Sequence, residues 1–289
     1  MPYLKAGYQA FILRYSVKKD AVWPNPLNDY EQAMELIRSH SEEWKLFADK
    51  VAVIGFSAGG HLAAAAATMA HNRPNAAILG YAVTGEDVKG CSQTAPDTIS
   101  AVNKDTCPCF LFATRTDNVV PIANSIRFME ALDKYDIAFE SHIYSHGPHG
   151  FSTCDTSVQD RNTVISSRVP NWVGDSISWL TDVFGDFGDG RMTEPVCKPH
   201  ISDDFEAFLS VDCTFARLMG NPQAKAILEP MMAKMPEADA EAAGTQLEMT
   251  DDLLAMMSKM KLRDMLSFGK TPEEVVKMLD EQLKKIPNI

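Results

Sequence analysis

Short, continuously apolar runs alternate with longer amphipathic segments from residue 10 to about residue 184. The clearest runs are residues 51–56 (VAVIGF), 76–83 (AAILGYAV) and 109–114 (CFLFAT). A strand that is apolar on both of its faces is typical of a parallel sheet with helices on both sides. Because helix-like segments separate these runs, the pattern predicts strands that are joined by right-handed crossovers.

The rest of this region predicts two more strands and four helices. Residues 10–15 are expected to form a strand, and the alternating residues 138–144 form one nearer the edge of the sheet. Helices are predicted over residues 30–46, 58–70, 121–134 and 172–184. Asp29 and Asn171 precede two of these helices and are the expected N-caps. The predicted fold class is therefore α/β, with a mostly parallel sheet flanked by helices.

The pattern changes after residue 184. Residues 185–204 contain glycine, proline and aspartate without any periodicity, and they are predicted to be a linker. Residues 205–289 contain ten of the fifteen methionines and no strand-like run, which predicts a small all-α module. We therefore expect an α/β domain over residues 1–184 and a helical C-terminal module over residues 205–289.

Two helices of this module are predicted from their periodicity. One covers residues 253–266. The other begins at residues 271–274, where Thr271 is the expected N-cap, Pro272 suits the first turn and Glu274 completes a capping box. Methionines at helical spacing line either an adaptable partner-binding groove or a hydrophobic core, and core is the commoner case. We expect core here.

The sharpest functional motif is Gly55-Phe56-Ser57-Ala58-Gly59, which matches G-x-S-x-G between a predicted strand and a predicted helix. Such a turn holds the serine in a strained conformation, and the flanking glycines remove Cβ atoms that would clash. Ser57 then projects from the sheet as a nucleophile, and the backbone N–H of Ala58 is the expected oxyanion donor. The alternative is a tight turn with an incidental serine.

A serine hydroxyl needs a base, and a nucleophile on this kind of turn is followed along the chain by an acid and then by a histidine. Asp117 comes directly after the predicted strand 109–114, where a parallel sheet presents functional groups. We expect Asp117 to be the acid of a triad. The alternatives are that it only caps the next helix, or that Asp105 or Asp155 is the acid.

The expected histidine is His149, in a glycine- and proline-containing loop after the last predicted strand. An imidazole titrates near neutral pH, so it can take the proton of Ser57 and return it to the leaving group. His146 and His142 are the alternatives. His61, on the helix after the serine, is expected to be a packed or hydrogen-bonded support.

Three segments together resemble bacterial acetyl esterases and acetylxylan-esterase-like proteins of the α/β-hydrolase superfamily (esterase/lipase). They are residues 55–63 around the serine, residues 6–17 with the following Trp23-Pro24, and the histidine loop at residues 140–151. The resemblance covers about residues 3–184. It implies an α/β-hydrolase fold and the hydrolysis of small acyl esters, typically acetyl groups on carbohydrate such as xylan, without a metal or an organic cofactor.

The chain departs from this family upstream of Ser57. Family members carry two or three further strands and a Gly-rich loop that supplies a second oxyanion donor, and no Gly-rich segment precedes Ser57 here. The expectation is an N-terminally truncated fold whose second donor is missing or comes from elsewhere. Losing one donor typically costs about 100- to 1,000-fold in rate. The exposed sheet edge, or the helical tail, would be the surface for homo-oligomer formation.

Composition narrows the partners. The formal net charge of −12 disfavours nucleic acid and anionic membrane and favours a neutral or cationic substrate. The sequence shows no signal peptide pattern and no apolar run long enough to span a bilayer, so a cytoplasmic protein is expected. The six cysteines have no metal-site spacing, and no cofactor is expected.

The leading hypothesis is a serine esterase that acts on small, mainly acetyl, esters of carbohydrates through Ser57, His149 and Asp117. A rival of another class is a catalytically impaired hydrolase remnant that serves as a binding protein, which the missing Gly-rich loop motivates. A peptidase or lipase that uses the same triad is the third hypothesis.

Overall fold

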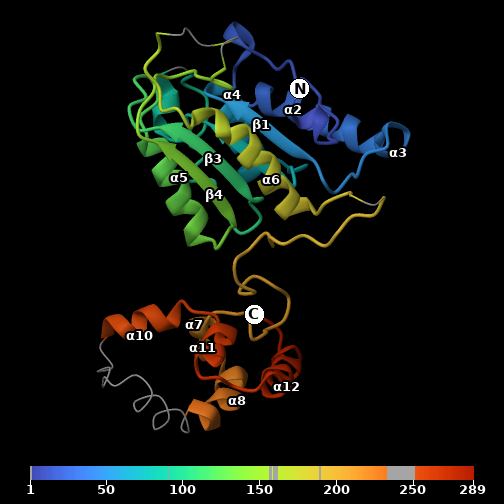
Figure 1. The fold of residues 1–289 in the computed structure, drawn as a ribbon, viewed down its shortest axis with the longest axis vertical. Helices are drawn as coiled ribbons and strands as arrows, with labels where there is room; N and C mark the ends of the chain where they lie inside the picture. Colours follow the sequence, from blue (N-terminus) through green and yellow to red (C-terminus); the bar gives the residue numbers. More distant parts are fainter. Residues whose placement is uncertain (1, 91, 156–157, 159–161, 189, 233–250) are drawn as a thin grey trace. The chain divides into compact units, whose positions relative to one another are not determined.

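The computed structural model describes residues 2–90, 92–155, 158, 162–188, 190–232 and 251–289. They belong to two compact units, Met1–Pro199 and His200–Ile289 (Figure 1). Each unit has its own hydrophobic core. The division falls inside residues 185–204, the segment predicted as a linker. No helix in the described part of the chain has both the length and the apolar character that crossing a membrane requires.

The first unit is built on four parallel strands, and their order in the sheet is their order in the chain. They are β1 (Ala52–Phe56), β2 (Ala76–Gly80), β3 (Cys109–Thr114) and β4 (Phe139–Tyr144). Every residue of β2 and β3 is buried, because each has a strand on both sides and helices over both faces. The prediction of a parallel α/β sheet is confirmed.

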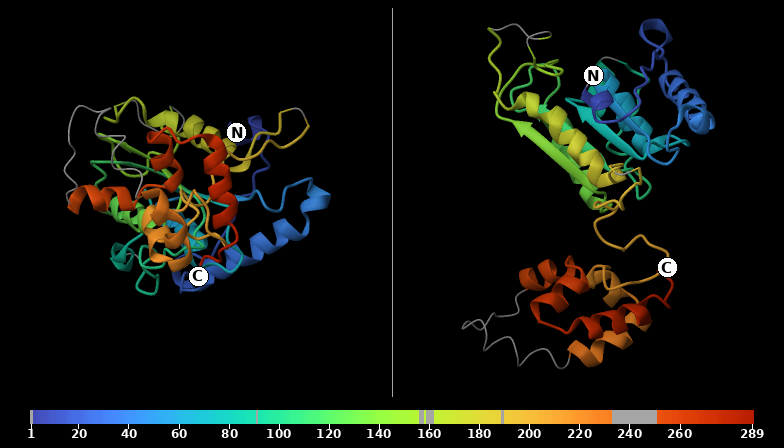
Figure 2. Two further views of the ribbon diagram at one scale, coloured as in Figure 1. Left: turned by 90° about the horizontal axis from the view of Figure 1, so that it is seen from below. Right: turned by 45° about the vertical axis from the view of Figure 1, so that its right-hand side comes forward.

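Successive side chains of the central strands enter two different cores, one on each face of the sheet. The helix at residues 172–184, drawn in yellow, lies across one of these faces (Figure 2). Ile78, Phe110 and Phe112 pack on one face against α6 (Trp172–Phe184). The aromatic ring of Phe112 stacks on that of Trp172, with ring centroids 4.0 Å apart. This face is therefore filled mainly by large rings.

The opposite face is covered by α4 (Ala58–Met69) and α5 (Ala123–Lys134), which pack against residues such as Leu79 and Leu111. The run of alanines in α4 is buried, and small side chains let a helix approach a sheet closely. This close approach sets the N-terminus of α4 directly against the carboxyl end of β1. Their junction is where Ser57 lies.

The prediction of a strand over residues 10–15 is wrong. This segment pairs with no strand in the described chain, and Phe11 and Ile12 are 51% and 93% exposed. An apolar sequence becomes a strand only where a neighbouring strand supplies the hydrogen bonds. Leu13 and Tyr15 instead pack, partly buried, on a small cluster beside the sheet.

Two helices replace the single helix predicted over residues 30–46. They are α2 (Asn25–Ser39) and α3 (Ser41–Trp44). Asp29 lies inside α2 rather than before it, and its carboxylate accepts a hydrogen bond from the backbone N–H of Ser16 at 2.7 Å. Asp29 therefore ties the helix to the preceding segment and is not an N-cap.

Asn171 occupies the predicted N-cap position of α6, but its side chain does not cap the helix. Asn171 makes no side-chain cap hydrogen bond, because it already has helical backbone angles in the short turn η3 (Val169–Asn171) that leads into α6. The remaining short helices of this unit are α1 (Pro2–Lys5), η1 (Lys18–Asp20) and η2 (Glu86–Gly90).

The described part of the second unit is helical, as predicted. Its helices are α7 (Phe215–Gly220), α8 (Pro222–Met232), α10 (Asp251–Ser258), α11 (Leu262–Phe268) and α12 (Glu273–Leu283). Mainly leucine, valine and isoleucine side chains from α7, α8, α11 and α12, and from the segments just before α7 and after α12, form one buried cluster. Two isolated antiparallel bridges accompany it.

Two details of the predicted module are wrong. The helix predicted over residues 253–266 is broken, because Lys261 is extended and pairs with Thr214 in an antiparallel bridge. Thr271 is not a cap, since Pro272 occupies the N-cap position of α12 and no capping hydrogen bond forms. In both places contacts with distant parts of the chain override the local helix propensity.

The prediction that the methionines form the core of this unit is wrong for Met256 and Met278. Both are more than half exposed, and among the described methionines Met219 packs against the buried cluster, where it is only partly buried. Leucines such as Leu218 and Leu283 fill the core instead. Leucine has fewer rotatable bonds than methionine and specifies a single packing better.

Because the first and second units have separate hydrophobic cores, we expect them to unfold independently. Leu218 is fully buried in the second unit, so Leu218→Ala should lower the free energy of unfolding of that unit by about 2–5 kcal/mol. All four tryptophans lie in the first unit, so tryptophan fluorescence reports on that unit alone. During urea unfolding, the variant should shift the transition seen by far-ultraviolet circular dichroism and leave the fluorescence midpoint unchanged. A fluorescence midpoint that moved equally would contradict two independent cores.

Candidate active site

Ser57 lies at a sharp turn between β1 and α4. Its backbone angles are φ 52° and ψ −119°, in a region that non-glycine residues rarely occupy. Two hydrogen bonds hold the turn. The N–H of Ser57 donates to the carbonyl of Gly80 in the next strand at 3.0 Å, and the carbonyl of Ser57 accepts from the N–H of His61. The serine side chain is thereby turned out beyond the end of the sheet, as the motif predicts.

Two glycines around this turn are required by close approach of the backbone. A Cβ atom on Gly55 would lie 2.0 Å from the carbonyl oxygen of Gly59, and one on Gly60 would lie 2.5 Å from the Cβ of Ala82. The expectation that Gly59 relieves such a clash is wrong. A Cβ there would meet only the hydroxyl of Tyr15, at 3.6 Å. Gly60 is the residue that lets α4 dock.

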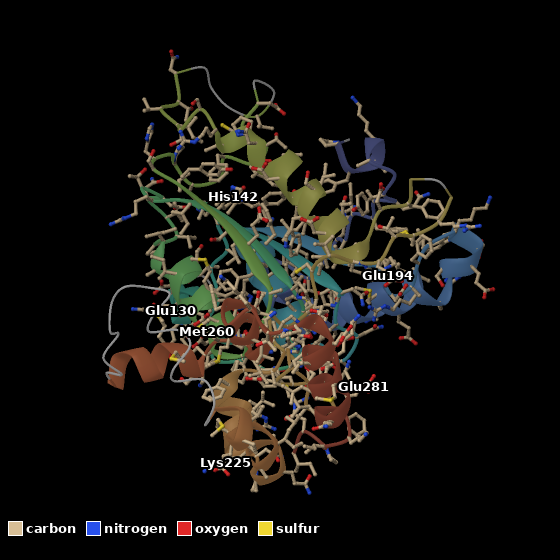
Figure 3. All side chains as sticks on the ribbon, turned by 60° about the horizontal axis from the view of Figure 1, so that its bottom comes forward. Glu130, His142, Glu194, Lys225, Met260 and Glu281 are labelled. Atoms are coloured by element: carbon tan, nitrogen blue, oxygen red, sulfur yellow. The ribbon has the colours of Figure 1, made fainter. Side chains whose placement is uncertain are left out.

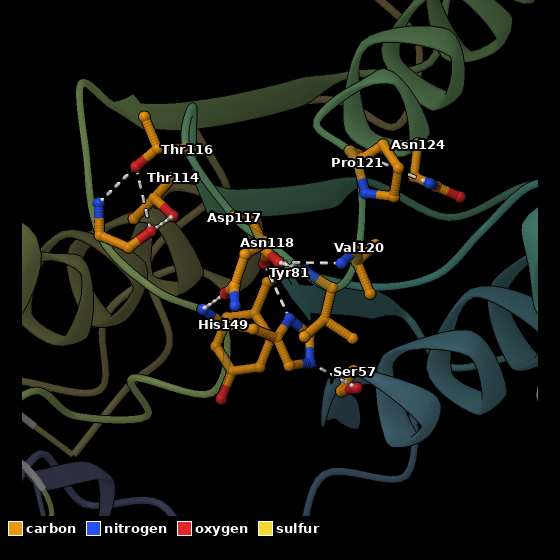
Figure 4. Close-up of polar contacts among 12 residues, drawn as sticks. Ser57, Tyr81, Thr114, Thr116, Asp117, Asn118, Val120, Pro121, Asn124 and His149 are labelled. Atoms are coloured by element: carbon orange, nitrogen blue, oxygen red, sulfur yellow. Dashed lines mark hydrogen bonds and ion pairs between the residues drawn. The ribbon is translucent and has the colours of Figure 1, made fainter.

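The structure brings Ser57, His149 and Asp117 into one line of contacts (Figure 4). His149 Nε2 lies 2.8 Å from Ser57 Oγ, and His149 Nδ1 lies 2.7 Å from Asp117 Oδ2. A carboxylate only accepts, so with Asp117 ionised the proton is on Nδ1, and Nε2 accepts from the Ser57 hydroxyl. These distances are short enough for proton transfer between serine and imidazole.

Each oxygen of the Asp117 carboxylate has a separate partner. Oδ2 faces the imidazole, while Oδ1 accepts hydrogen bonds from the backbone N–H groups of Val119 and Val120, both at 2.8 Å. The side chain is 1% exposed. Its two possible roles, orienting a histidine and closing the turn before α5, therefore occur together.

Residues around Asp117 also hold the histidine loop. The hydroxyls of Thr114 and Thr116 both donate to the carbonyl of Gly147, and the Asn118 amide oxygen accepts from the N–H of His149 at 3.3 Å (Figure 4). Sequence reasoning missed these three residues. Their signal was a run of polar side chains at the carboxyl end of a buried strand, immediately before and after the proposed acid.

His146 and His142, the two histidines that could have replaced His149, bond elsewhere. His146 Nδ1 lies 3.1 Å from the hydroxyl of Ser145. His142 lies on β4 (Figure 3), where its Nε2 is 2.8 Å from Glu140 Oε1 and its ring stacks on that of Phe110. Neither side chain contacts the hydroxyl of the candidate nucleophile.

Three other candidates from the sequence also bond to groups other than Ser57, His149 and Asp117. They are His61, Asp105 and Asp155. His61 is buried on α4, and its Nε2–H donates to the carbonyl of Pro96 at 2.9 Å, which is a supporting contact. Asp105 forms an ion pair with Lys104. Asp155 accepts a hydrogen bond from the hydroxyl of Thr153.

Ala58 is the first residue of α4, so its N–H belongs to the set of helix N-terminal donors that have no acceptor inside the helix. Such donors attract negative charge. A shallow hollow of about 370 Å³ is lined by residues of the histidine loop, such as His146, and by Thr116 and Asn118. Ser57, His149 and Asp117 do not line this hollow, so it is separate from the contacts between them.

Within the described residues, no group of three or more His, Cys, Asp or Glu side chains is placed to hold a metal ion.

Comparison with known proteins finds relatives among xylan-degrading and esterase proteins. A family model described as BD-FAE matches residues 1–78. Endo-1,4-beta-xylanase B of Butyrivibrio fibrisolvens is 27% identical over 186 residues, which are 54% of this chain and 29% of the relative. Acetylxylan esterase of Xylanibacter ruminicola is 28% identical over 148 residues, 44% of this chain and 31% of the relative. The chain thus spans less than a third of the length of either relative.

A solved structure gives the more complete match. MGS-M1, an alpha/beta hydrolase enzyme from a Medee basin deep-sea metagenome library, is 37% identical to this chain and superposes with a TM-score of 0.57. The match covers 63% of this chain and 74% of that protein.

The two glycines after Ser57 should differ in their tolerance of a side chain. Gly60→Ala forces a Cβ against Ala82 and should cost about 1–3 kcal/mol in the free energy of unfolding. Gly59→Ala meets no close contact, and alanine is the better helix former, so this matched variant should be neutral or slightly stabilising. Urea unfolding followed by tryptophan fluorescence measures both. Equal midpoints for the two variants would show that the approach of α4 to Ala82 is not tight.

Burial lowers the pKa of His61 below its ordinary value, although its hydrogen bond to Pro96 and the nearby Asp97 act the other way. The folded state therefore binds fewer protons than the unfolded state as the pH falls below about 6.5. The stability of the first unit should be full above that pH and should fall below it, by up to about 1.4 kcal/mol per pH unit. His61→Gln keeps an N–H donor for Pro96 and should flatten this slope in urea unfolding between pH 5 and 8. An unchanged slope would exclude His61 as the cause.

Proposed function

Because this chain belongs to the α/β-hydrolase family, we propose that it is a serine esterase that hydrolyses small acyl esters. The observation that carries the proposal is the line of contacts from Ser57 Oγ through the His149 imidazole to the Asp117 carboxylate, at 2.8 Å and 2.7 Å. A strained nucleophile turn, a base within hydrogen-bond reach and a buried acid behind it are the parts that acyl transfer by a serine requires.

In the proposed reaction, Ser57 Oγ attacks the ester carbonyl while His149 Nε2 takes its proton. The imidazolium that forms is stabilised and oriented by Asp117, whose second oxygen is held by two backbone N–H groups. The N–H of Ala58 donates to the oxyanion of the tetrahedral intermediate. His149 then returns the proton to the leaving alcohol, which leaves an acyl group on Ser57. In the second half, His149 takes a proton from water as the water attacks the acyl carbon. His149 then returns this proton to Ser57 Oγ as the carboxylic acid leaves.

We further propose that the substrate is an acetyl ester of a carbohydrate. One relative is an acetylxylan esterase, and another is a xylanase. The formal net charge of −12 disfavours anionic substrates and is compatible with a neutral sugar.

The activity is tested with p-nitrophenyl acetate on the full chain. Ser57→Ala should reduce kcat/KM by at least about 1,000-fold, because the variant lacks the nucleophile. Ser39→Ala is the matched control, since that hydroxyl lies at the end of α2 and bonds to Leu36 and His40, and the variant should keep the wild-type rate. A Ser57→Ala variant as active as the wild type would overturn the proposed nucleophile.

Covalent labelling separates the rival hypotheses. A fluorophosphonate probe should modify the wild type and not Ser57→Ala, whereas an impaired remnant would remain unlabelled in both. Release of acetate from acetylated xylo-oligosaccharides tests the substrate class. Labelling together with release from p-nitrophenyl acetate but not from the oligosaccharides would retain the esterase and discard the carbohydrate substrate.

A further inference from the structure

Tyr81 occupies the position after β2 that Ser57 occupies after β1. Phe56 pairs with Gly80 in the parallel register, so the next residue of each strand, Ser57 and Tyr81, lie side by side at the end of the sheet. Tyr81 also has a left-handed backbone, with φ 34°. A positive φ on a bulky residue costs of order 1–3 kcal/mol and persists only where surrounding contacts impose it.

The contacts that impose this conformation are dense. The N–H of Tyr81 donates to the carbonyl of Phe112 at 2.7 Å, which extends the pairing of β2 with β3 by one residue. The tyrosine ring packs against the rings of Phe56, Phe112 and Phe151, and Tyr81 is only 4% exposed. Gly80 makes room for two of these rings, since a Cβ there would lie 2.6–2.7 Å from them.

The same ring lies against the imidazole of His149. The two ring centroids are 5.0 Å apart and the planes meet at 74°, an edge-to-face arrangement (Figure 4). Hydrogen bonds to Ser57 and Asp117 fix the two nitrogens of the imidazole, but they leave its tilt about the line through these atoms less restricted. A ring packed against the side of the imidazole restricts that tilt.

The hydroxyl of Tyr81 provides a second connection to the histidine loop. It accepts a hydrogen bond from the N–H of Ser152 at 3.2 Å, and the carbonyl of Ser152 accepts from the indole N–H of Trp172 at 2.9 Å. Ser152 is three positions beyond His149 in the chain. One side chain therefore contacts both the imidazole and the backbone of the loop that carries it.

We propose that Tyr81 is a positioning residue, whose ring fixes the tilt of the His149 imidazole and whose hydroxyl ties the histidine loop to the end of β2. The catalytic consequence rests on the proposed esterase function. Misplacing a catalytic group by as little as 1 Å can cost about 100-fold in rate, so the loss of this contact should act on kcat rather than on binding.

The kinetic test compares three variants with p-nitrophenyl acetate. Tyr81→Leu should lower kcat about 10- to 100-fold and leave KM within about threefold. Tyr81→Phe keeps the ring and should recover most of this loss, the remaining deficit being that of the Ser152 hydrogen bond. Phe128→Leu is the matched control, because it removes an equally buried ring from the core on the other face of the sheet. It should leave kcat unchanged. An equal fall in kcat for Phe128→Leu, or a wild-type kcat for Tyr81→Leu, would overturn the proposal.

A spectroscopic test is independent of turnover. The proton on His149 Nδ1, which is hydrogen-bonded to Asp117 Oδ2, should give a low-field proton resonance, assigned by its loss in Asp117→Asn. Wild type, Tyr81→Phe and Phe128→Leu should retain it, and Tyr81→Leu should broaden or lose it as the imidazole gains freedom. A sharp resonance in Tyr81→Leu would overturn the positioning role. If the resonance is lost in Tyr81→Leu but the wild type cleaves no ester, the positioning role is retained and the esterase function is overturned instead.

Discussion

The register of the parallel strands is the constraint on which the site depends. Pairing Phe56 with Gly80, and Gly80 with Phe112, places the residues that follow these strands at one edge of the sheet. β2 and β3 are apolar on both faces, so hydrophobicity alone would tolerate a slip of one residue, although such a slip reverses every side chain. Shape does not tolerate it, because only glycine fits at position 80 between the rings on the neighbouring strands.

This tight fit also explains how two strained residues persist next to each other. Ser57 and Tyr81 each have a positive φ, at a cost of order 1–3 kcal/mol apiece. The first is held by the docking of the alanine-rich α4 and the second by the cluster of aromatic rings beneath α6. The two cores, one on each face of the sheet, thus stabilise a conformation that turns Ser57 out beyond β1 and holds the Tyr81 ring among the aromatic side chains under α6.

Local patterns in the sequence were sufficient for the central strands and for the order of Ser57, Asp117 and His149, because both depend on features a few residues long. They were insufficient wherever a distant segment decides the outcome. Residues 10–15 have the composition of a strand but no partner in the described chain, and Lys261 leaves a helical pattern to pair with Thr214. The importance of Gly60 and of Tyr81 depends on contacts across strands and could not be inferred from their neighbours in the chain.

Asp117 shows why two interpretations of one residue need not compete. A carboxylate that only closed the turn before α5 would leave one oxygen for solvent, and one that only faced His149 could rotate about its side-chain torsion. Here two backbone N–H groups, from Val119 and Val120, hold Oδ1 and so fix the direction of Oδ2 towards the imidazole. The turn orients the acid, and the acid orients the base. Any change that opened this turn would therefore disturb the imidazole without touching it.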